Sequence, residues 1–129
     1  MIYLPDTHAV VWYVDNDSRL SRAAEAVLDN PANKLVVPTM VLVEIQFLFA
    51  RGRVNSSLAD VQRKIISARN CAIHSLDEAV VAQIPTNLNI HDSIIVATAL
   101  VYRDVLHQPV TLITKDGEIT RSGLIQTLW

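Results

Sequence analysis

The chain has 129 residues, with eleven Lys and Arg against thirteen Asp and Glu, and a formal net charge of −2. Half of the residues are apolar and only three are Gly, which excludes a disordered or fibrous chain. The near-neutral charge excludes a strongly basic nucleic-acid coat, but it does not exclude a local basic patch. A chain of this length buries roughly 68% of its unfolded surface. We therefore expect one compact domain over residues 1–129.

Cys71 is the only cysteine, so no internal disulfide can form, and no Cys or His with metal-ligand spacing surrounds it. We interpret it as a small buried hydrophobic residue in a reducing compartment. No apolar stretch approaches the roughly 20 residues of a membrane span, and the N-terminus lacks the features of a signal peptide. The sequence therefore predicts a soluble, unprocessed, cytoplasmic protein.

Apolar strands alternate with helices through the whole chain. In chain order the pattern predicts a strand over Ile2–Pro5, helices over 8–14 and 22–28, a strand over Lys34–Pro38, helices over 39–51 and 57–67, a strand over 71–76, helices over 78–84 and 91–106, a strand over 110–114, a helical turn after 117 and an edge strand within 123–129. Such alternation is typical of an α/β fold whose parallel sheet is covered on both faces. We expect the apolar residues of the two helices over 39–67, including Ile65 and Ile66, to face other parts of the protein.

Acidic residues follow the predicted strands where an open parallel sheet binds its ligands. Asp6 comes directly after the strand over Ile2–Pro5, and Asp116 follows the strand over 110–114 with one residue between them. Glu44 lies in the helix that follows a third strand, and Asp92 stands at the start of a long helix. Because ligands bind outside the carboxyl ends of parallel strands, all four acids could meet at one end of the sheet.

Three of these acids also have a purely structural interpretation. Asp92 is placed to cap its helix, Asp116 forms a turn pair with the following glycine, and Asp6 could cap the helix after it. From the sequence alone these alternatives stay open. Glu44 is harder to explain in this way, because it interrupts an apolar helix without a Lys or Arg at helical spacing. An unpaired buried carboxylate is costly, so something positive should lie near it.

Carboxylates that converge on one point repel one another unless a cation lies between them. An all-oxygen set of ligands suits Mg²⁺ or Mn²⁺, and the lack of a Cys or His cluster argues against Zn²⁺. The acids therefore indicate a site for a hard divalent cation.

Stretches along the whole chain resemble the PIN-domain ribonucleases, in particular the VapC-type toxins of type II (VapBC) toxin–antitoxin systems. These stretches are LPDTHAVVWYV, VVPTMVLVEIQFLFARGRV, NIHDSIIVATAL and LITKDGEI. The places of the family's acidic set are occupied by Asp6, Glu44, Asp92 and Asp116. The resemblance implies a three-layer α/β/α sandwich with a parallel sheet of four or five strands. It also implies an Mg²⁺- or Mn²⁺-dependent endoribonuclease that a small antitoxin inhibits, with the metal held by Asp6, Asp92 and Asp116 and the site completed by Glu44.

Hydroxyl residues of this chain stand beside the acids, as they often do in the family, and basic residues stand near them. Our candidates for substrate binding are Thr7, His8, Thr39, Arg51, Arg53, His91 and Thr114. For the threonines, capping or turn hydrogen bonds are the alternative interpretation. For the arginines, which form a cationic cluster with Arg63, Lys64 and Arg69, the alternative is a solvated helix face. Trp12 and Tyr13 are interpreted as core or interface residues.

Two positions depart from the pattern of the family. Ser93 follows Asp92 where many toxin-type members have an arginine, so an arginine contact to the substrate has no counterpart here. Pro5 removes a backbone donor from an expected central strand, although the last position of a strand tolerates proline best.

The apolar helices over 39–67 offer more hydrophobic surface than one small core needs, which suggests a homodimer, an antitoxin groove, or both. Two other hypotheses compete with the nuclease. A haloacid-dehalogenase-like phosphatase also places an Asp after its first strand, but it requires a second acid where this chain has His8. A non-catalytic PIN-like binding module would keep the fold without the activity, and the presence of all four acids counts against it.

Overall fold

The computed structural model of the chain describes all 129 residues and shows strands that alternate with helices. In chain order the elements are β1 (Ile2–Pro5), α1 (Thr7–Val14), α2 (Arg22–Asp29), β2 (Lys34–Pro38), α3 (Thr39–Ala50), α4 (Leu58–Ser67), β3 (Cys71–His74), α5 (Glu78–Ala82), α6 (Ile90–Leu100), the π-helical segment η1 (Val101–Val105), β4 (Val110–Ile113), α7 (Gly117–Ser122) and β5 (Thr127–Leu128). The strands form one five-stranded sheet in the order β3-β2-β1-β4-β5, and every pair is parallel.

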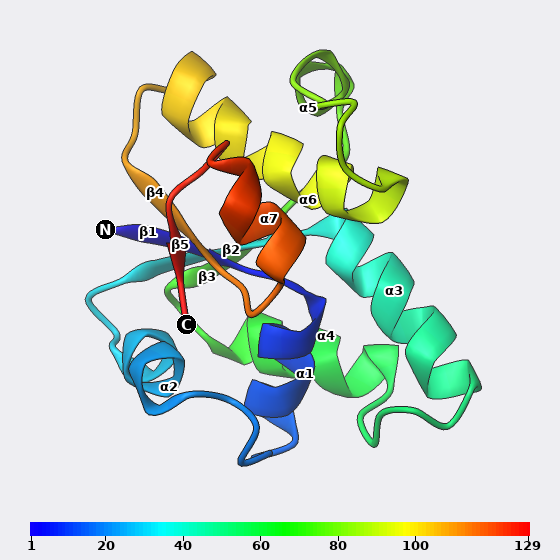
Figure 1. The fold of residues 1–129 in the computed structure, drawn as a ribbon. Helices are drawn as coiled ribbons and strands as arrows, with labels where there is room; N and C mark the ends of the chain where they lie inside the picture. Colours follow the sequence, from blue (N-terminus) through cyan, green and yellow to red (C-terminus); the bar gives the residue numbers. More distant parts are fainter.

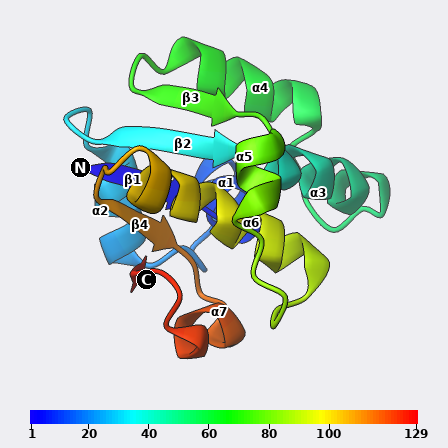
Figure 2. The same ribbon diagram turned by 90° about the horizontal axis from the view of Figure 1, so that it is seen from above.

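Helices cover both faces of this sheet. In Figure 1, α5 and α6 lie above the sheet, whereas α1, α2 and α4 lie below it. Helix α3 lies beyond the carboxyl ends of the strands, as the view in Figure 2 shows. The predicted α/β/α sandwich with a parallel sheet is therefore confirmed, and the sheet has the larger of the two expected numbers of strands.

The apolar strands are explained by burial on both faces. On one face, Leu4 packs in a cluster with Ile95 of α6 and Leu112 of β4, and all three are almost fully buried. On the other face, Leu35 packs with Leu28 of α2 in a second cluster. Strands that are covered on both sides read as continuous apolar runs, which is why IYLP, KLVVP and VTLI contain so few polar residues.

The strand β1 lies at the centre of the sheet, between β2 and β4. Its last residue, Pro5, is opposite Ile113, and the next residue, Asp6, donates its backbone N–H to the carbonyl of Ile113 at 3.0 Å. Pro5 has no backbone N–H to donate, but it is the last paired residue of β1. The next residue, Asp6, donates the hydrogen bond to β4 at this end of the strand. This register places Asp6 at the carboxyl end of the central strand.

Most predicted helices are present, but the long helix over 91–106 is not one α-helix. It begins at Ile90, and after Leu100 it continues as the π-helical segment Val101–Val105. Ser21 caps α2 as predicted, accepting a hydrogen bond from the N–H of Ala24. None of the helices combines the length and the hydropathy that a membrane span requires.

Two predictions about burial are wrong in part. On α3, Val41 and Ile45 are buried, but Phe47 keeps 58% of its surface exposed, and Ile66 on α4 keeps 82%. Both helices lie at the outside of the molecule, so part of their apolar surface faces solvent. Cys71 is only half-buried, and burial raises the pKa of its thiol.

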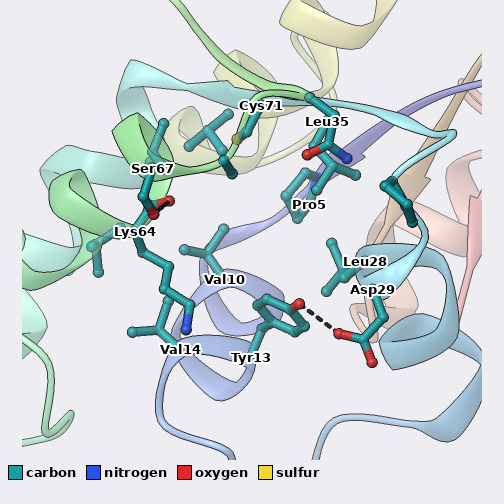
Figure 3. Close-up of a pocket in the computed structure, with 16 residues that line it drawn as sticks. Pro5, Val10, Tyr13, Val14, Leu28, Asp29, Leu35, Lys64, Ser67 and Cys71 are labelled. Carbon is teal, nitrogen blue, oxygen red and sulfur yellow. Dashed lines mark hydrogen bonds between the residues drawn. The ribbon is translucent and has the colours of Figure 1, made fainter.

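Cys71 lines an apolar cavity of about 320 Å³ below the sheet, between α1, α2 and α4. Figure 3 shows this cavity, with Tyr13 at its edge donating a 2.6 Å hydrogen bond to Oδ1 of Asp29. None of the four candidate acids lines it. It is therefore separate from the site predicted at the carboxyl ends of the strands.

Candidate active site

A polar cavity of about 280 Å³ opens at the carboxyl ends of β1 and β4. All four predicted acids line it, and we call it the acid pocket. Its lining residues are Asp6, Thr7, His8, Trp12, Glu44, Asp92, Ile95, Lys115 and Asp116. Four separate elements of the chain thus bring their carboxylates to one place, as expected for residues that follow parallel strands.

Asp6 is the most buried of the four acids, with 9% of its surface exposed. One carboxylate oxygen, Oδ1, accepts the N–H of Ala9 at 2.9 Å and so caps α1, while Oδ2 accepts the hydroxyl of Thr114 at 2.5 Å. Burial raises the pKa of Asp6 and the negative charge of Asp92 adds to the rise, whereas the two hydrogen bonds and His8 act in the opposite direction. Capping and a place in the acid pocket are thus compatible for the same side chain.

Asp116 is held in place by its position at the start of α7. Its carboxylate caps this helix by accepting the N–H of Ile119 at 2.9 Å, and its own N–H donates to the hydroxyl of Thr114 at 3.0 Å. Thr114 therefore joins Asp6 and Asp116 through a single hydroxyl group. The turn interpretation of this segment was correct in part, because Asp116 is a helix cap that also lines the pocket.

Glu44 projects from α3 toward the pocket, and its neighbours explain how an acid is tolerated in an apolar helix. The hydroxyl of Thr7 donates to Oε1 of Glu44 at 2.7 Å. On the other oxygen, Nδ1 of His91 lies 3.8 Å from Oε2. The polar neighbours of Glu44 are therefore a hydroxyl from α1 and an imidazole from α6, which no spacing within α3 could have indicated.

Asp92 lies in the first turn of α6, and its interpretation as the N-cap is wrong. The cap is Asn89, whose Oδ1 accepts the N–H of Asp92 at 2.9 Å. The amide Nδ2 of Asn89 also donates to Oδ2 of Asp92 at 2.6 Å. Burial raises the pKa of Asp92, and the negative charges of Asp116 and Glu44 add to the rise, as does Glu118.

The chemistry of these side chains fits a hard divalent cation, because all four acids that line the pocket offer carboxylate oxygens. Burial raises the pKa of Asp6 and of Asp92, and the negative charge of neighbouring acids adds to both rises. The side chains do not form a closed set of ligands as they stand: no three His, Cys, Asp or Glu side chains are arranged so that they could hold a metal ion.

The other candidates fall into two groups. Thr7, His8 and Thr114 contribute to the acid pocket or bond to its acids, and His91 adjoins Glu44. Arg51 lines a neighbouring hollow together with Glu44 and His91. Thr39 instead accepts a hydrogen bond from the N–H of Leu76 at 3.0 Å, and neither Thr39 nor Arg53 lines the acid pocket.

Sequence reasoning missed three residues of the site. Lys115 lies between Thr114 and Asp116, so its place in the TKDG segment was a usable signal. Trp12 lies four residues after His8 on the same face of α1, which was a weaker signal. Asn89 stands three residues before Asp92, the spacing of a helix cap and its partner.

Comparisons with known proteins agree with this architecture. The model of the PIN domain family matches residues 3–123. No curated protein sequence matches the chain.

Two solved structures have the same fold. One is a chain in the crystal structure of VapBC2 from Rickettsia felis bound to a DNA fragment from their promoter, with a TM-score of 0.67 and 16% identity over 99% of this chain and 98% of that one. The other is a chain in the structure of VapBC-1 from nontypeable Haemophilus influenzae, with a TM-score of 0.63 and 21% identity over 99% of this chain and 97% of that one. Because the family model covers nearly the whole sequence, this chain belongs to the PIN-domain family.

Proposed function

We propose that this chain is a divalent-metal-dependent endoribonuclease and the toxin of a toxin–antitoxin pair, with its catalytic unit in a single domain over residues 1–129. PIN domains are a family of nucleases. The observation that carries the proposal is the acid pocket, in which Asp6, Glu44, Asp92 and Asp116 come together from four elements. A binding module would not need four carboxylates in one cavity, where each negative charge makes it less favourable for the others to ionise.

We assign Asp6, Asp92 and Asp116 to the metal. A bound Mg²⁺ or Mn²⁺ would supply positive charge that neutralises the scissile phosphate and makes water more acidic. The three carboxylates are oriented for this task by donors outside the pocket: Thr114 for Asp6, Asn89 for Asp92 and the start of α7 for Asp116. Such supporting bonds fix the direction of each ligand.

Glu44 has a different role in the proposed reaction. Thr7 occupies Oε1, so Oε2 is the oxygen available to orient the attacking water and to accept its proton. Nδ1 of His91 stands 3.8 Å from this oxygen, a position from which the imidazole can contact the substrate. Attack of the water on phosphorus forms the new P–O bond and breaks one ester bond of the phosphodiester, and the leaving oxygen takes up a proton from solvent.

The proposed partners are an RNA substrate, a small antitoxin protein and a second copy of the chain. The antitoxin is supported by the two similar structures, which are both of VapBC proteins. The homodimer is supported by two exposed apolar residues one turn apart on α3, Val43 and Phe47. A toxin of this kind would act in the cytoplasm, where its RNA substrate is found.

Cleavage assays separate this function from its competitors. The purified chain should cut single-stranded RNA internally in Mg²⁺ or Mn²⁺ and should not release phosphate from a small phosphomonoester. Release of phosphate from the monoester without RNA cleavage would favour the phosphatase. RNA binding without any cleavage, in either metal, would favour the non-catalytic binding module.

A further inference from the structure

Trp12 lies on the wall of the acid pocket and has two cations close to its ring. The guanidinium of Arg19 is 4.9 Å from the ring centroid and the ammonium of Lys115 is 5.7 Å from it. Both distances are within the range of a cation–π interaction. The ring is itself held by neighbouring aromatic side chains, since His8 and Trp129 lie with their centroids at 5.2 and 5.7 Å.

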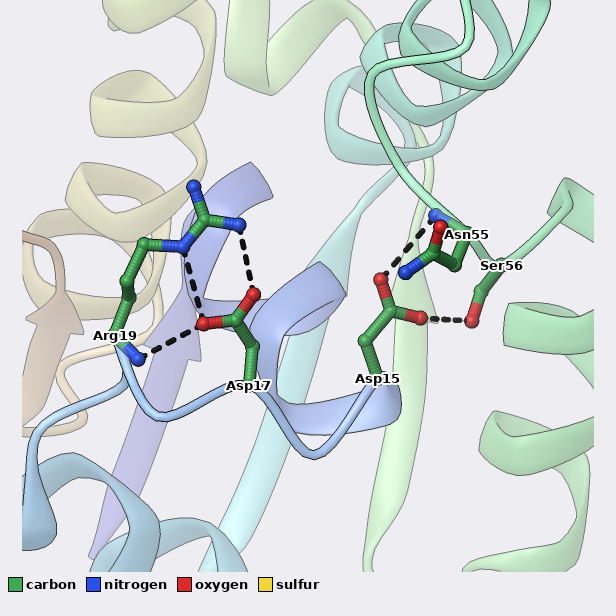
Figure 4. Close-up of polar contacts among 5 residues, drawn as sticks. All are labelled: Asp15, Asp17, Arg19, Asn55 and Ser56. Atoms are coloured by element: carbon green, nitrogen blue, oxygen red, sulfur yellow. Dashed lines mark hydrogen bonds and ion pairs between the residues drawn. The ribbon is translucent and has the colours of Figure 1, made fainter.

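Of the two cations, only Arg19 is paired with an acid. Arg19 binds Asp17 through Nε and Nη2, at 3.0 and 2.7 Å, as Figure 4 shows. This pairing lowers the pKa of Asp17 to about 2. Lys115, by contrast, takes part in none of the ion pairs of the structure, and its ammonium donates to no side chain or carbonyl. Its charge is therefore available to a ligand.

The position of Lys115 is unexpected for a lysine that shares a cavity with four carboxylates. Its neighbour in sequence is Asp116, yet its ammonium lies over the ring of Trp12 and is not paired with an acid. The positive charge is thus kept at the wall of the pocket, away from the acids. No other Lys or Arg lines the pocket.

A cavity lined by four acids repels the phosphates of RNA, and the affinity of proteins for the nucleic-acid backbone comes from Lys and Arg. We infer that Lys115 binds a backbone phosphate of the RNA beside the acid pocket and that Trp12 is the positioning residue that holds its ammonium there. The inference rests on the proposed nuclease function, because it assigns the phosphate contact of the same site. It predicts an RNA contact in the acid pocket itself, which neither Arg51 nor Arg63 lines.

The test replaces Lys115 by Gln and uses Lys34→Gln as the matched control. Lys34 is exposed at the start of β2, at the opposite end of the sheet, and the substitution changes the charge by the same amount. Binding of a fluorescein-labelled single-stranded RNA is measured by anisotropy in EDTA at several salt concentrations, and KM and kcat are measured in Mg²⁺. Lys115→Gln should weaken binding or raise KM by roughly three- to tenfold at low salt. It should also make the negative slope of log association constant against log salt shallower by about 0.7, which corresponds to the loss of one phosphate contact.

The role of Trp12 is tested in the same two assays. Trp12→Leu should weaken binding as Lys115→Gln does, Trp12→Phe should restore most of the loss, and Trp12→Leu should have no further effect when Lys115 is already Gln. A purely structural role would lower Tm and affect both backgrounds equally, and this result would overturn the positioning role.

The outcomes separate this inference from the proposed function. If RNA is cleaved and Lys115→Gln behaves like Lys34→Gln in both assays, the inference is overturned and the nuclease stands. If RNA is bound with the expected dependence on Lys115 but is never cleaved, the nuclease fails and the phosphate contact stands. If the wild-type chain neither binds nor cleaves RNA, both are overturned.

Discussion

The hydroxyl of Thr114 donates a 2.5 Å hydrogen bond to Oδ2 of Asp6, across 108 positions of the sequence. The same oxygen of Thr114 accepts the N–H of Asp116 at 3.0 Å. One side chain between β4 and α7 thus sets the positions of two acids that come from opposite ends of the chain. The parallel pairing of β1 with β4 makes this contact possible, since it brings Asp6 level with the end of β4.

Replacing Asp6 by Asn should abolish RNA cleavage and leave Tm unchanged or higher in EDTA. Burial raises the pKa of Asp6 above its ordinary value, so its stabilising contribution is present below that value and is lost as the pH rises through the folded pKa. At neutral pH the buried charge is therefore a cost, and Asn removes the charge while it still caps α1. Thermal unfolding and cleavage are measured on the same preparation.

Ser21→Ala is the control for the capping role of Asp6. It removes the cap of α2 far from the acid pocket and should cost about 1 kcal/mol of stability without affecting cleavage. Asp6 would be only a helix cap if Asp6→Asn retained cleavage.

Replacing Thr7 by Val should lower kcat roughly tenfold with little change in KM. The substitution removes the donor to Oε1 of Glu44, and the loss of one hydrogen bond to a charged group corresponds to about 1.5 kcal/mol. The matched control is Thr39→Val, because the hydroxyl of Thr39 accepts a hydrogen bond from the N–H of Leu76 and does not face the pocket. Equal losses of kcat in the two variants would contradict the assignment of Thr7.

The hydroxyl of Tyr13 should titrate near pH 12. Burial and the hydrogen bond to Asp29 raise the pKa of Tyr13 to about 12, from an ordinary value of 10.0. The folded pKa is the higher one, so this contribution to stability is complete below pH 10 and is lost as the pH rises toward 12. The difference between the ultraviolet titrations of the wild type and Tyr13→Phe isolates this group among the three tyrosines. A difference curve centred near pH 10 would show that the cavity edge in Figure 3 does not hold this bond in solution.

The outer face of α3 should carry the proposed homodimer contact. Phe47 is 58% exposed there, with the exposed Val43 one turn before it on the same helix. Light scattering after size-exclusion chromatography should give a dimer for the wild type and a monomer for Phe47→Asp. Ile66→Asp, at an apolar residue of α4 that is 82% exposed, should leave the dimer intact. A wild-type chain that is monomeric at high concentration would rule out this contact.

Much of the fold could be predicted from the sequence because the physical signals are local. Apolar runs bounded by turn residues located β1, β2 and β4, and Ser21 marked the start of α2. The change from α6 to a π-helical segment after Leu100 has no such signal, because it depends on how the helix packs. The exposure of Phe47 and Ile66 could not be predicted either, since it depends on which helix face meets the sheet.

The candidate acids could be proposed from their places after strands, but their partners could not. Thr7 and Glu44 are 37 positions apart, and only the folded chain shows that they share a hydrogen bond. The same holds for Lys115, whose ammonium lies over a ring from α1. Long-range contacts of this kind depend on how helices and loops pack at the end of the sheet, which a single sequence does not specify.

The most direct test of the account is cleavage of a single-stranded RNA in Mg²⁺, with and without EDTA, by the wild type, Asp92→Asn and Lys34→Gln. Asp92 is chosen because Asn89 caps α6 in its place, so the substitution leaves the helix start intact. We expect cleavage to fall by at least about 100-fold both in EDTA and in Asp92→Asn, and to be unchanged in Lys34→Gln. Cleavage that persists in EDTA, or in Asp92→Asn, would contradict the proposed metal-dependent site.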